Sequence, residues 1–229
     1  MSVVKSLLAA SVLVAGPALA ADPAHPTVIE LYESQGCSDC PPANANLNAI
    51  ADRPDVLALN FAVTYWDQLG WRDIFAKPAF TARQWEYAHA AGRGNVFTPQ
   101  MIVNGRGVLV GSNRAQVEQA IHAYDRGDAG PAIARSGGKV TIGKGPVRAA
   151  ATVWLVRYDP RTLAVPIRAG ENGGRTLSHR DIVRALQPLG SWTGAPLTLD
   201  LPAGSDPAYR SAILVQQGKG GPIIAAARL

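Results

Sequence analysis

The chain has two cysteines, Cys37 and Cys40, and only two residues separate them. A β-rich run from Thr27 to Tyr32 ends shortly before the pair, and Pro41-Pro42 follows it, as in the first turn of a helix, where a missing N–H does no harm. The free N–H groups and the dipole at a helix N-terminus stabilise a thiolate. The motif therefore predicts Cys37 as a nucleophile and Cys40 as the resolving thiol. A purely structural bridge is the alternative, although it would stabilise little because it closes a minimal loop.

The first twenty residues have the pattern of a secretory signal peptide. Lys5 precedes an apolar stretch from Leu7 to Leu19, and the small-residue sequence Ala18-Leu19-Ala20 offers a cleavage site before Ala21. We therefore expect residues 1–20 to be removed and the mature chain to be periplasmic or secreted, in an oxidising space. No later segment is apolar over the ~20 residues that a membrane span requires, so we expect no span in the mature chain.

Charge and motifs argue against two classes of function. The formal net charge is +5, but the basic residues are scattered, whereas a nucleic-acid-binding protein concentrates them in a patch or stripe. We therefore expect no nucleic-acid partner. The chain also lacks the G-x-S-x-G nucleophile turn of many hydrolases.

Residues 25–126 alternate between predicted strands and helices in the order β-α-β-α-β-β-α. The segment Val56 to Val63 is nearly continuous in apolar residues, as expected for a strand covered on both faces, and Asn104-Gly105 is a strong hairpin turn. We expect an α/β domain with a mixed sheet flanked by helices. Its cysteine pair would lie at the carboxyl end of the first strand, where open α/β sheets place their sites. The predicted helices are 43–51, 79–91 and 114–124.

The composition changes after residue 126. Residues 127–137 are rich in glycine and are interpreted as a linker, and residues 138–229 are predicted to form a smaller β-rich domain. One segment, Ser178 to Leu189, is ambiguous. The helical spacing of Ile182, Leu186 and Leu189 favours a helix, which is the interpretation adopted, whereas the predicted strands around it favour a strand. The predicted strands are 139–142, 148–158, 164–168, 197–201, 211–216 and 223–228.

With these elements in place, the first domain resembles the thioredoxin fold. Cys37-Ser38-Asp39-Cys40 and Thr98-Pro99 before a strand carry this resemblance. More narrowly, Gly36-Cys37-Ser38-Asp39-Cys40-Pro41-Pro42 and Tyr65-Trp66-Asp67-Gln68-Leu69-Gly70-Trp71 are similar to a family of secreted bacterial thioredoxin-like proteins of undetermined function. That similarity runs through Gly170-Glu171-Asn172 and Arg175 to His179 towards the end of the chain. The resemblance implies a cis bond before Pro99 beside the disulfide, and a redox-active disulfide with no further cofactor.

The chain departs from thioredoxin in two places. Gly36 stands where thioredoxins have tryptophan, and the separation between Cys37 and Pro99 is longer than in minimal thioredoxins. The aromatic segment accounts for the excess and is predicted to form a wall of the substrate groove over the disulfide. The groove residues are Tyr65, Trp66 and Trp71, supported by Thr98 and Pro99. These aromatic residues could instead belong to the core.

Two carboxylates are candidates for tuning the cysteines. Asp39 lies between them, and a carboxylate near a forming thiolate raises the thiol pKa, which predicts a more reducing couple than in strong oxidants. The alternative is a solvated side chain that serves the helix N-terminus. Glu30 lies near the end of the first strand, where thioredoxins carry a buried acid that relays a proton to the resolving cysteine. If it were buried near Cys40 it could act as a general base; an exposed strand carboxylate is the alternative.

These patterns predict a thiol-disulfide oxidoreductase that exchanges disulfides with a partner protein carrying a dithiol or a disulfide. The direction of exchange and the oligomeric state stay open. A Cu(I) site formed by Cys37 and Cys40 is the main alternative, since two thiolates suit that ion. The histidines that could complete such a site, none with local ligand spacing, are His25, His89, His122 and His179. A non-catalytic envelope binding protein is a third possibility.

Overall fold

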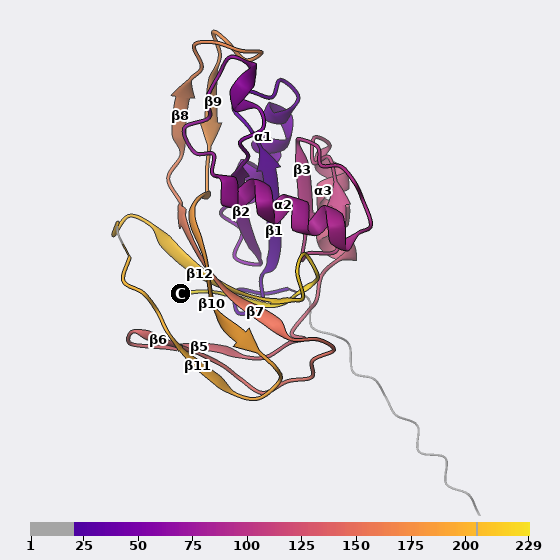
Figure 1. Ribbon diagram of the computed structural model, residues 1–229, viewed down its shortest axis with the longest axis vertical. Helices are drawn as coiled ribbons and strands as arrows, with labels where there is room; N and C mark the ends of the chain where they lie inside the picture. Colours follow the sequence, from indigo (N-terminus) through magenta and orange to yellow (C-terminus); the bar gives the residue numbers. More distant parts are fainter. Residues whose placement is uncertain (1–20, 205) are drawn as a thin grey trace, which may run out of the picture.

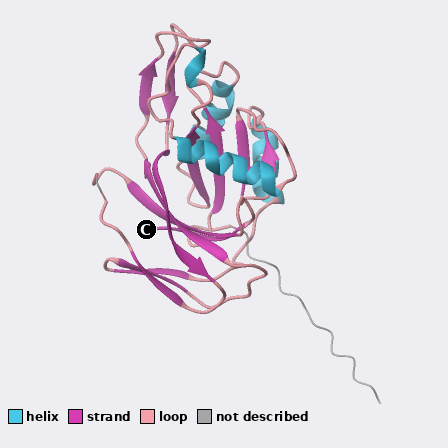
Figure 2. Cartoon of the chain, viewed as in Figure 1, coloured by secondary structure: helices cyan, strands magenta, loops and turns pink. Residues whose placement is uncertain are grey.

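The computed structural model describes residues 21–204 and 206–229, and the predicted signal peptide, residues 1–20, lies outside them. Its helices are α1 (Cys40–Ile50), α2 (Pro78–Ala90) and α3 (Arg114–Ala123), with a short 3-10 helix at Asp67–Leu69. Its strands are β1 (Thr27–Glu33), β2 (Val56–Ala62), β3 (Gln100–Val103), β4 (Gly107–Leu109), β5 (Ile133–Ser136), β6 (Lys139–Ile142), β7 (Ala151–Asp159), β8 (Leu163–Pro166), β9 (Thr176–His179), β10 (Ile182–Trp192), β11 (Leu197–Asp200), β12 (Arg210–Gln217) and β13 (Ile223–Arg228). Figures 1 and 2 show their arrangement.

Helices flank the half of the main sheet that contains β1 to β4. β1 runs parallel to β2 and antiparallel to β3, so the sheet is mixed. Leu47 of α1 and Ile121 of α3 belong to the same buried cluster as Ile29, on one face. α2 packs on the other face through Phe80 and lies across the front of the sheet in Figure 1. This is the α/β architecture that the sequence predicts for residues 25–126.

The side chains of β1 alternate between the two covered faces of the sheet. Every residue of β1 and β2 is buried, because helices cover both sides, and the strands therefore have no regular polar positions. Successive side chains of a strand point to opposite faces. Those facing α2 are Val28, Glu30 and Tyr32, and those facing α1 are Ile29, Leu31 and Glu33.

The β-rich part of the chain extends the same sheet. β10 joins β2 in parallel, with Ile182 opposite Asn60, and the strand order is β13-β12-β7-β10-β2-β1-β3-β4. The three-stranded sheet β11-β6-β5 packs against β7, so that Val140 and Val153 share a buried cluster. Residues 133–136 of the predicted linker form β5, which pairs with β6. The two predicted units are thus joined by continuous strand pairing.

The predicted helix from Ser178 to Leu189 is wrong. His179 ends β9, and β10 begins at Ile182 and runs antiparallel to β7, with two irregularities of register. Pro188 lies within β10; in a helix interior it would remove a hydrogen bond and clash with the preceding turn. The helical spacing of Ile182, Leu186 and Leu189 was therefore a weaker signal than pairing with the long neighbouring strand.

A hairpin of the β-rich part lies against the first helix. β8 and β9 pair antiparallel and are joined by residues 167–175, which we call the 167–175 loop. In Figure 1 the hairpin rises beside α1. Asn44 and Asn48 of α1 donate side-chain hydrogen bonds of 2.9 and 2.8 Å to the carbonyl oxygen of Ser178 in β9. This hairpin brings residues distant in sequence to the end of the sheet that carries the cysteines.

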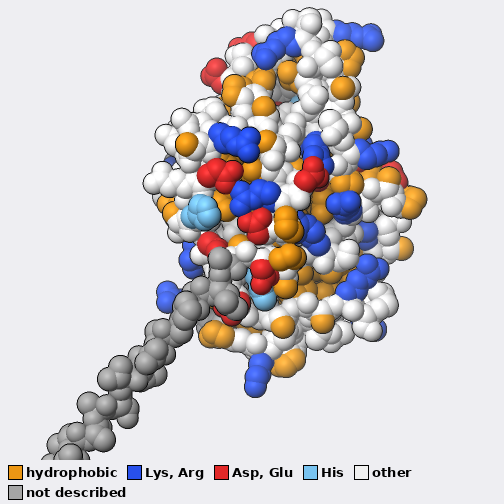
Figure 3. Space-filling model, turned by 180° about the vertical axis from the view of Figure 1, so that it is seen from behind, with side chains coloured by type: hydrophobic (Ala, Val, Ile, Leu, Met, Phe, Trp, Pro, Cys, Tyr) orange, Lys and Arg blue, Asp and Glu red, His pale blue; other side chains and the backbone are white. Residues whose placement is uncertain are grey.

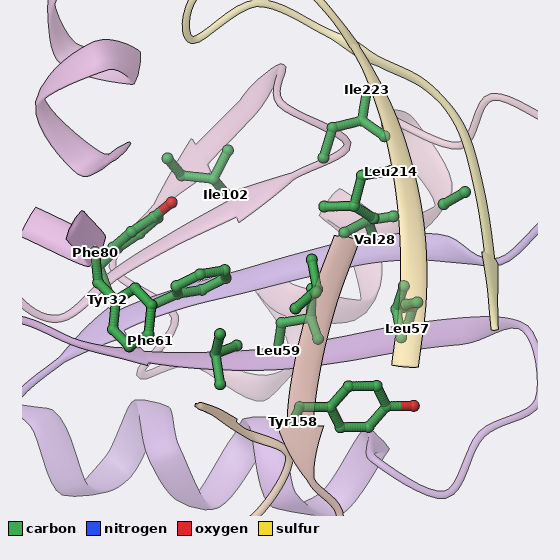
Figure 4. Packing of buried hydrophobic residues seen from close by; sticks show 14 of the residues in the cluster. Val28, Tyr32, Leu57, Leu59, Phe61, Phe80, Ile102, Tyr158, Leu214 and Ile223 are labelled. Carbon is green, nitrogen blue, oxygen red and sulfur yellow. The ribbon is translucent and has the colours of Figure 1, made fainter. Parts of the chain in front are cut away.

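The main core contains residues from both predicted units (Figure 4). Tyr32 and Phe61 stack with ring centroids 5.3 Å apart, and Phe80 meets Phe61 edge-on at the same distance. Tyr158 and Leu214, from β7 and β12, belong to the same buried cluster. Because this cluster is shared, the first unit would expose apolar surface if the second were removed.

Two further features concern membrane-spanning helices and the distribution of surface charge. No helix in the described ranges is long and apolar enough to cross a membrane. On the face seen in Figure 3, Lys and Arg side chains are interspersed with Asp and Glu rather than gathered into one patch.

Candidate functional site

Cys37 and Cys40 form a disulfide at the start of α1. Cys40 is the first residue of the helix, with Pro41 and Pro42 in the first turn, as the sequence predicts. The N–H of Cys37 donates to the carbonyl of Ser34, and the N–H of Cys40 donates to the carbonyl of Cys37. The strand-to-helix junction thus places both sulfurs at the N-terminal end of a helix, where an anion is stabilised.

Both sulfurs are covered in this oxidised state. Cys37 and Cys40 are each 1% exposed, whereas Ser38 and Asp39 between them are exposed. A groove of about 410 Å³ runs past them, and neither cysteine lines it. Its lining residues are Ser38, Asp39, Pro42, Phe97, Thr98, Pro99, Val110 and Ser112.

The groove brings together three of the residues proposed from sequence, Asp39, Thr98 and Pro99. The Thr98–Pro99 peptide bond is cis, as the resemblance implies. Asp39 occupies the N-cap position of α1 but makes no side-chain capping hydrogen bond. Its exposed carboxylate therefore lies near the helix end and the disulfide without a capping role.

The aromatic segment does not line the groove itself, but it contacts groove-lining Thr98 and Gln35 next to the cysteine motif. The Trp66 indole N–H donates to Thr98 Oγ1 at 2.7 Å, and the Trp71 indole N–H donates to Gln35 Oε1 at 2.9 Å. The hydroxyl of Tyr65 is 3.3 Å from Gln84 Oε1. These contacts fix the segment beside the site, and whether it selects partners stays a prediction.

Glu30 is buried, but the structure does not bring it to Cys40. It faces α2, where its carboxylate accepts hydrogen bonds from Arg83 Nε at 2.9 Å and from the Tyr87 hydroxyl at 2.5 Å. Arg83 also donates to Gln216 Oε1 of β12 at 3.0 Å. The alternation of β1 explains this placement, since α1 and its cysteine cover the opposite face.

A second group of buried ionisable side chains lies on the α1 face. His179 Nδ1 is 3.1 Å from a carboxylate oxygen of Glu33, and both side chains are almost completely buried. The Asn44 amide nitrogen lies 3.0 Å from the same ring nitrogen, and Asn44 is one helical turn after Cys40 on α1. Asp73, 3% exposed, is close enough to influence both charges. We call Glu33, Asp73 and His179 the buried acid–histidine cluster.

The cluster can exchange protons near neutral pH. Burial, with a contribution from the nearby Glu33 carboxylate, raises the pKa of Asp73 to about 7. Burial alone would lower the pKa of His179, but Glu33 and, less strongly, Asp73 raise it above its ordinary value. His179 Nε2 is buried and has no hydrogen-bond partner among the described residues. Asp73 is also tied to the site, because one of its oxygens accepts the N–H of Gln35 at 2.7 Å.

Sequence reasoning missed this cluster for two different reasons. Glu33 could have been found, because it continues the alternation of Ile29 and Leu31 if the first strand is extended by one residue. Asp73 and His179 come from a loop and from β9, and no local pattern connects them to the cysteines. Only the path of the β8–β9 hairpin brings His179 to α1.

The 167–175 loop also lies against the cysteine motif. The Asn172 amide nitrogen donates to the carbonyl oxygens of Gln35 and Cys37 at 2.9 and 2.8 Å, and Asn172 is fully buried. A carboxylate oxygen of Glu171 accepts the backbone N–H of Ser38 at 3.1 Å. Hydrogen bonds from the Ser38 hydroxyl and N–H lower the pKa of Glu171.

The described residues offer little support for a metal site. They contain no group of three or more His, Cys, Asp or Glu side chains placed to hold a metal ion. A Cu(I) ion would therefore depend on Cys37 and Cys40, after their disulfide had been reduced. Of the histidines named from the sequence, His179 is engaged with Glu33.

The fold and site define an α/β protein with a Cys-x-x-Cys disulfide at the N-terminus of a helix. The chain belongs to DUF1223, a family of proteins of unknown function whose sequence profile matches residues 28–216. The crystal structure of protein AGR_C_4864 from Agrobacterium tumefaciens is similar, with 32% identity, a TM-score of 0.75, and coverage of 89% of this chain and 93% of that one.

A more distant solved structure shares the fold alone. HBP35 of Porphyromonas gingivalis has 13% identity and a TM-score of 0.60, with coverage of 90% of this chain and 74% of that one. No curated protein sequence matches the chain.

Proposed function

We propose that this protein is an exported thiol-disulfide oxidoreductase that exchanges disulfides with a partner protein. The observation that carries the proposal is the placement of Cys37 and Cys40 at the N-terminus of α1, beside a groove lined by cis Pro99. A helix end lowers the pKa of a thiol, and the thiolate is the attacking species in disulfide exchange. The chemistry needs only the two cysteines and no bound cofactor.

The exchange takes place in two displacement steps. The Cys37 thiolate attacks one sulfur of a partner disulfide, which forms a mixed disulfide and releases the other partner sulfur as a thiolate. Cys40 then loses its proton and attacks Sγ of Cys37, so that the Cys37–Cys40 bond forms and the partner leaves as a dithiol. The partner gains two electrons and two protons. The same steps in reverse oxidise a partner dithiol.

The buried acid–histidine cluster supports the proton transfers at Cys40. Cys40 must give up a proton when it attacks and take one up when it leaves. Asp73, with a pKa of about 7, can hold or release a proton near neutral pH, and His179 lies close to Asn44 on the Cys40 face of α1. We assign the cluster as the proton reservoir for Cys40, the role that sequence reasoning gave to Glu30.

The groove supports a protein or peptide substrate. Pro99 has no N–H, so the backbone beside it is left free to pair with an extended segment of a partner. Phe97 and Val110 give the groove apolar surface, and Val110 is 48% exposed. Ser38 and Asp39 form its polar side, next to the disulfide.

Trapping of a mixed disulfide tests the proposal. With Cys40→Ala, the resolving step is blocked, and Cys37 should remain joined to its partner as a band of higher mass on non-reducing gels that disappears with reductant. Cys37→Ala is the matched control, because it keeps one thiol but lacks the nucleophile, and it should trap nothing.

Two outcomes would count against the proposal. Equal trapping by both variants would indicate non-specific oxidation. If Cys40→Ala traps nothing in the envelope while the reduced wild type binds one Cu(I) ion, the copper alternative replaces disulfide exchange.

A further inference from the structure

The 167–175 loop is hydrogen-bonded to the backbone of the cysteine motif in the oxidised protein. Asn172 is buried, and its side-chain amide donates hydrogen bonds to the carbonyl oxygens of Gln35 and Cys37, on both sides of Gly36. Cys37 and Cys40 are 1% exposed, and neither lines the neighbouring groove. Displacement at sulfur requires direct access, so a part of the structure must move before a thiol can react with Cys37. The 167–175 loop is the candidate segment, because it is bound to the backbone on both sides of Gly36.

The loop is organised by its own hydrogen bonds. The N–H of Gly173 donates to the carbonyl of Gly170, and the N–H of Gly174 donates to the carbonyl of Ile167. Gly170 also lies close to Gly70 and Trp71, where a Cβ atom on Gly170 would come within 3.1 Å of the Trp71 side chain. Because these turns are internal, the loop can separate from the cysteine motif as a unit while β8 and β9 stay paired.

Glu171 binds the cysteine motif in a way that depends on charge. Its carboxylate accepts the N–H of Ser38, the residue directly after Cys37. The amide groups at this end of α1 are also the ones that would stabilise a Cys37 thiolate. In the disulfide state Cys37 is neutral and the carboxylate has no competitor. In the dithiol state a Cys37 thiolate would join two carboxylates, Glu171 and Asp39, at the same end of the helix, and like charges at short range repel.

We propose that reduction of the Cys37–Cys40 disulfide releases the 167–175 loop, and that Glu171 couples the two events. The loop closes over the disulfide and opens over the thiolate, so the reduced protein presents Cys37 to a partner disulfide while the oxidised protein is shielded from general reductants. This gating deepens the proposed function and rests on it for its biological partner. The coupling itself needs only the cysteine pair.

The reduction can be carried out with a defined small dithiol. Dithiothreitol loses two electrons and two protons and closes to its cyclic disulfide. The S–S bond between Cys37 and Cys40 breaks, leaving a thiol on Cys40 and, above the thiol pKa, a thiolate on Cys37 with its proton released to buffer.

Hydrogen exchange of residues 167–175 tests the coupling in purified mature protein. Peptides covering the loop should exchange about tenfold faster or more after reduction by dithiothreitol, as expected from repulsion between two nearby surface charges. The increase should grow with pH as the Cys37 thiol ionises. In Glu171→Gln the side chain can still accept the Ser38 N–H but carries no charge, so reduction should change exchange by less than about twofold.

A Cys37→Ser/Cys40→Ser variant separates the lost crosslink from the new charge. It has neither a disulfide nor a thiolate, and its loop should stay as protected as in the oxidised wild type. The proposal is overturned if oxidised and reduced wild type exchange equally, if Glu171→Gln opens as fully as wild type, or if the double serine variant opens as fully. If the loop opens on reduction but Cys40→Ala traps no partner, the coupling holds and only the proposed exchange function is refuted. If a partner is trapped but the loop does not open, only the coupling is refuted.

Discussion

Strand β1 carries two buried glutamates on opposite faces of the sheet, and the two differ in their partners. Glu30 faces α2 and is bound by Arg83 and by the Tyr87 hydroxyl. Glu33 faces α1 and is bound by His179, with Asp73 nearby. Arginine keeps its charge at any pH that the protein meets, whereas histidine and a buried carboxylic acid can change theirs near neutrality.

The difference separates a structural ion pair from a group that can take part in chemistry. Arg83 is a permanent cation held against Glu30, so this arrangement is a structural ion pair. In the second arrangement, burial and the nearby Glu33 raise the pKa of Asp73 to about 7, and the pKa of His179 is also raised, so Asp73 and His179 can exchange protons near neutral pH. Only the second arrangement lies on the face that carries Cys40, so proton chemistry belongs to the α1 side of the sheet.

The largest expected effect comes from removing the permanent cation. Arg83→Met leaves the Glu30 carboxylate buried without its partner, and we expect the free energy of unfolding to fall by about 3–5 kcal/mol. Urea denaturation followed by circular dichroism measures the change. The reduction potential of Cys37–Cys40 should stay unchanged in this variant, because the pair lies on the other face.

A double variant provides the control for this prediction. Glu30→Leu combined with Arg83→Met replaces the ion pair by apolar side chains and should recover most of the lost stability. If Arg83→Met does not fold but the double variant does, the result still shows that the unpaired Glu30 carboxylate causes the loss of stability. A loss below about 1 kcal/mol in Arg83→Met, the range of exposed ion pairs, would refute the structural role.

The same strand shows what the sequence can and cannot predict. The β1–Cys37–α1 junction and the turn at Asn104-Gly105 depend on residues close together in the chain, and the predictions for them are confirmed. The cis bond before Pro99, which the resemblance implies, is confirmed as well. In the turn, both residues have positive φ angles of 47 and 66°, as Asn-Gly hairpins require.

Contacts between distant segments could not be predicted in this way. Glu30 is predicted from the resemblance to thioredoxin, and Glu33 is not among the predicted site residues, although the two-residue period of the strand places it on the face of Ile29 and Leu31. The apolar spacing in the first part of β10 fits a helix as well as a strand. Only the pairing of β10 with β7, which the sequence does not reveal, decides between the two. His179 lies in the segment predicted as a helix, Ser178 to Leu189. With a helix there, the sequence gives no reason to place His179 beside Glu33 and Asp73.

An intermediate effect is expected in the pH dependence of stability. The folded pKa of Asp73 is raised from 3.8 to about 7, so the folded state binds more protons than the unfolded state between these values. Its contribution to stability is present below pH 3.8 and is lost as the pH rises to about 7. The raised pKa of His179 acts in the same direction, above its ordinary value of 6.5. We expect a loss of about 1–3 kcal/mol between about pH 5 and about pH 7.5.

Asp73→Asn should reduce this slope, because asparagine does not titrate; it also weakens a hydrogen bond, which lowers stability at low pH, where Asp73 is protonated. Urea denaturation at several pH values measures the slope. Asp181 is the matched comparison, because burial also raises its pKa to about 7, whereas the charges that act on it are those of Arg180, Arg210, Arg228 and Asp52 and not those of the cluster. Asp181→Asn should reduce the slope too, but only Asp73→Asn should also change the pH profile of disulfide exchange. A slope unaffected by Asp73→Asn would remove Asp73 from the proton reservoir.

The smallest expected effect concerns Asp39, a third carboxylate, which is exposed at the N-cap of α1. Its charge disfavours a thiolate on Cys37, so Asp39→Asn should shift the reduction potential towards oxidising values by about 10–20 mV, the size expected from one exposed charge near a helix end. Equilibration with glutathione mixtures measures the shift, with Asp52→Asn as a control for the loss of an exposed carboxylate elsewhere. A shift of zero or of opposite sign would refute this role. If Glu33→Gln moves the potential further than Asp39→Asn, the buried cluster dominates the couple, and the contrast between the two faces of β1 extends from stability to redox chemistry.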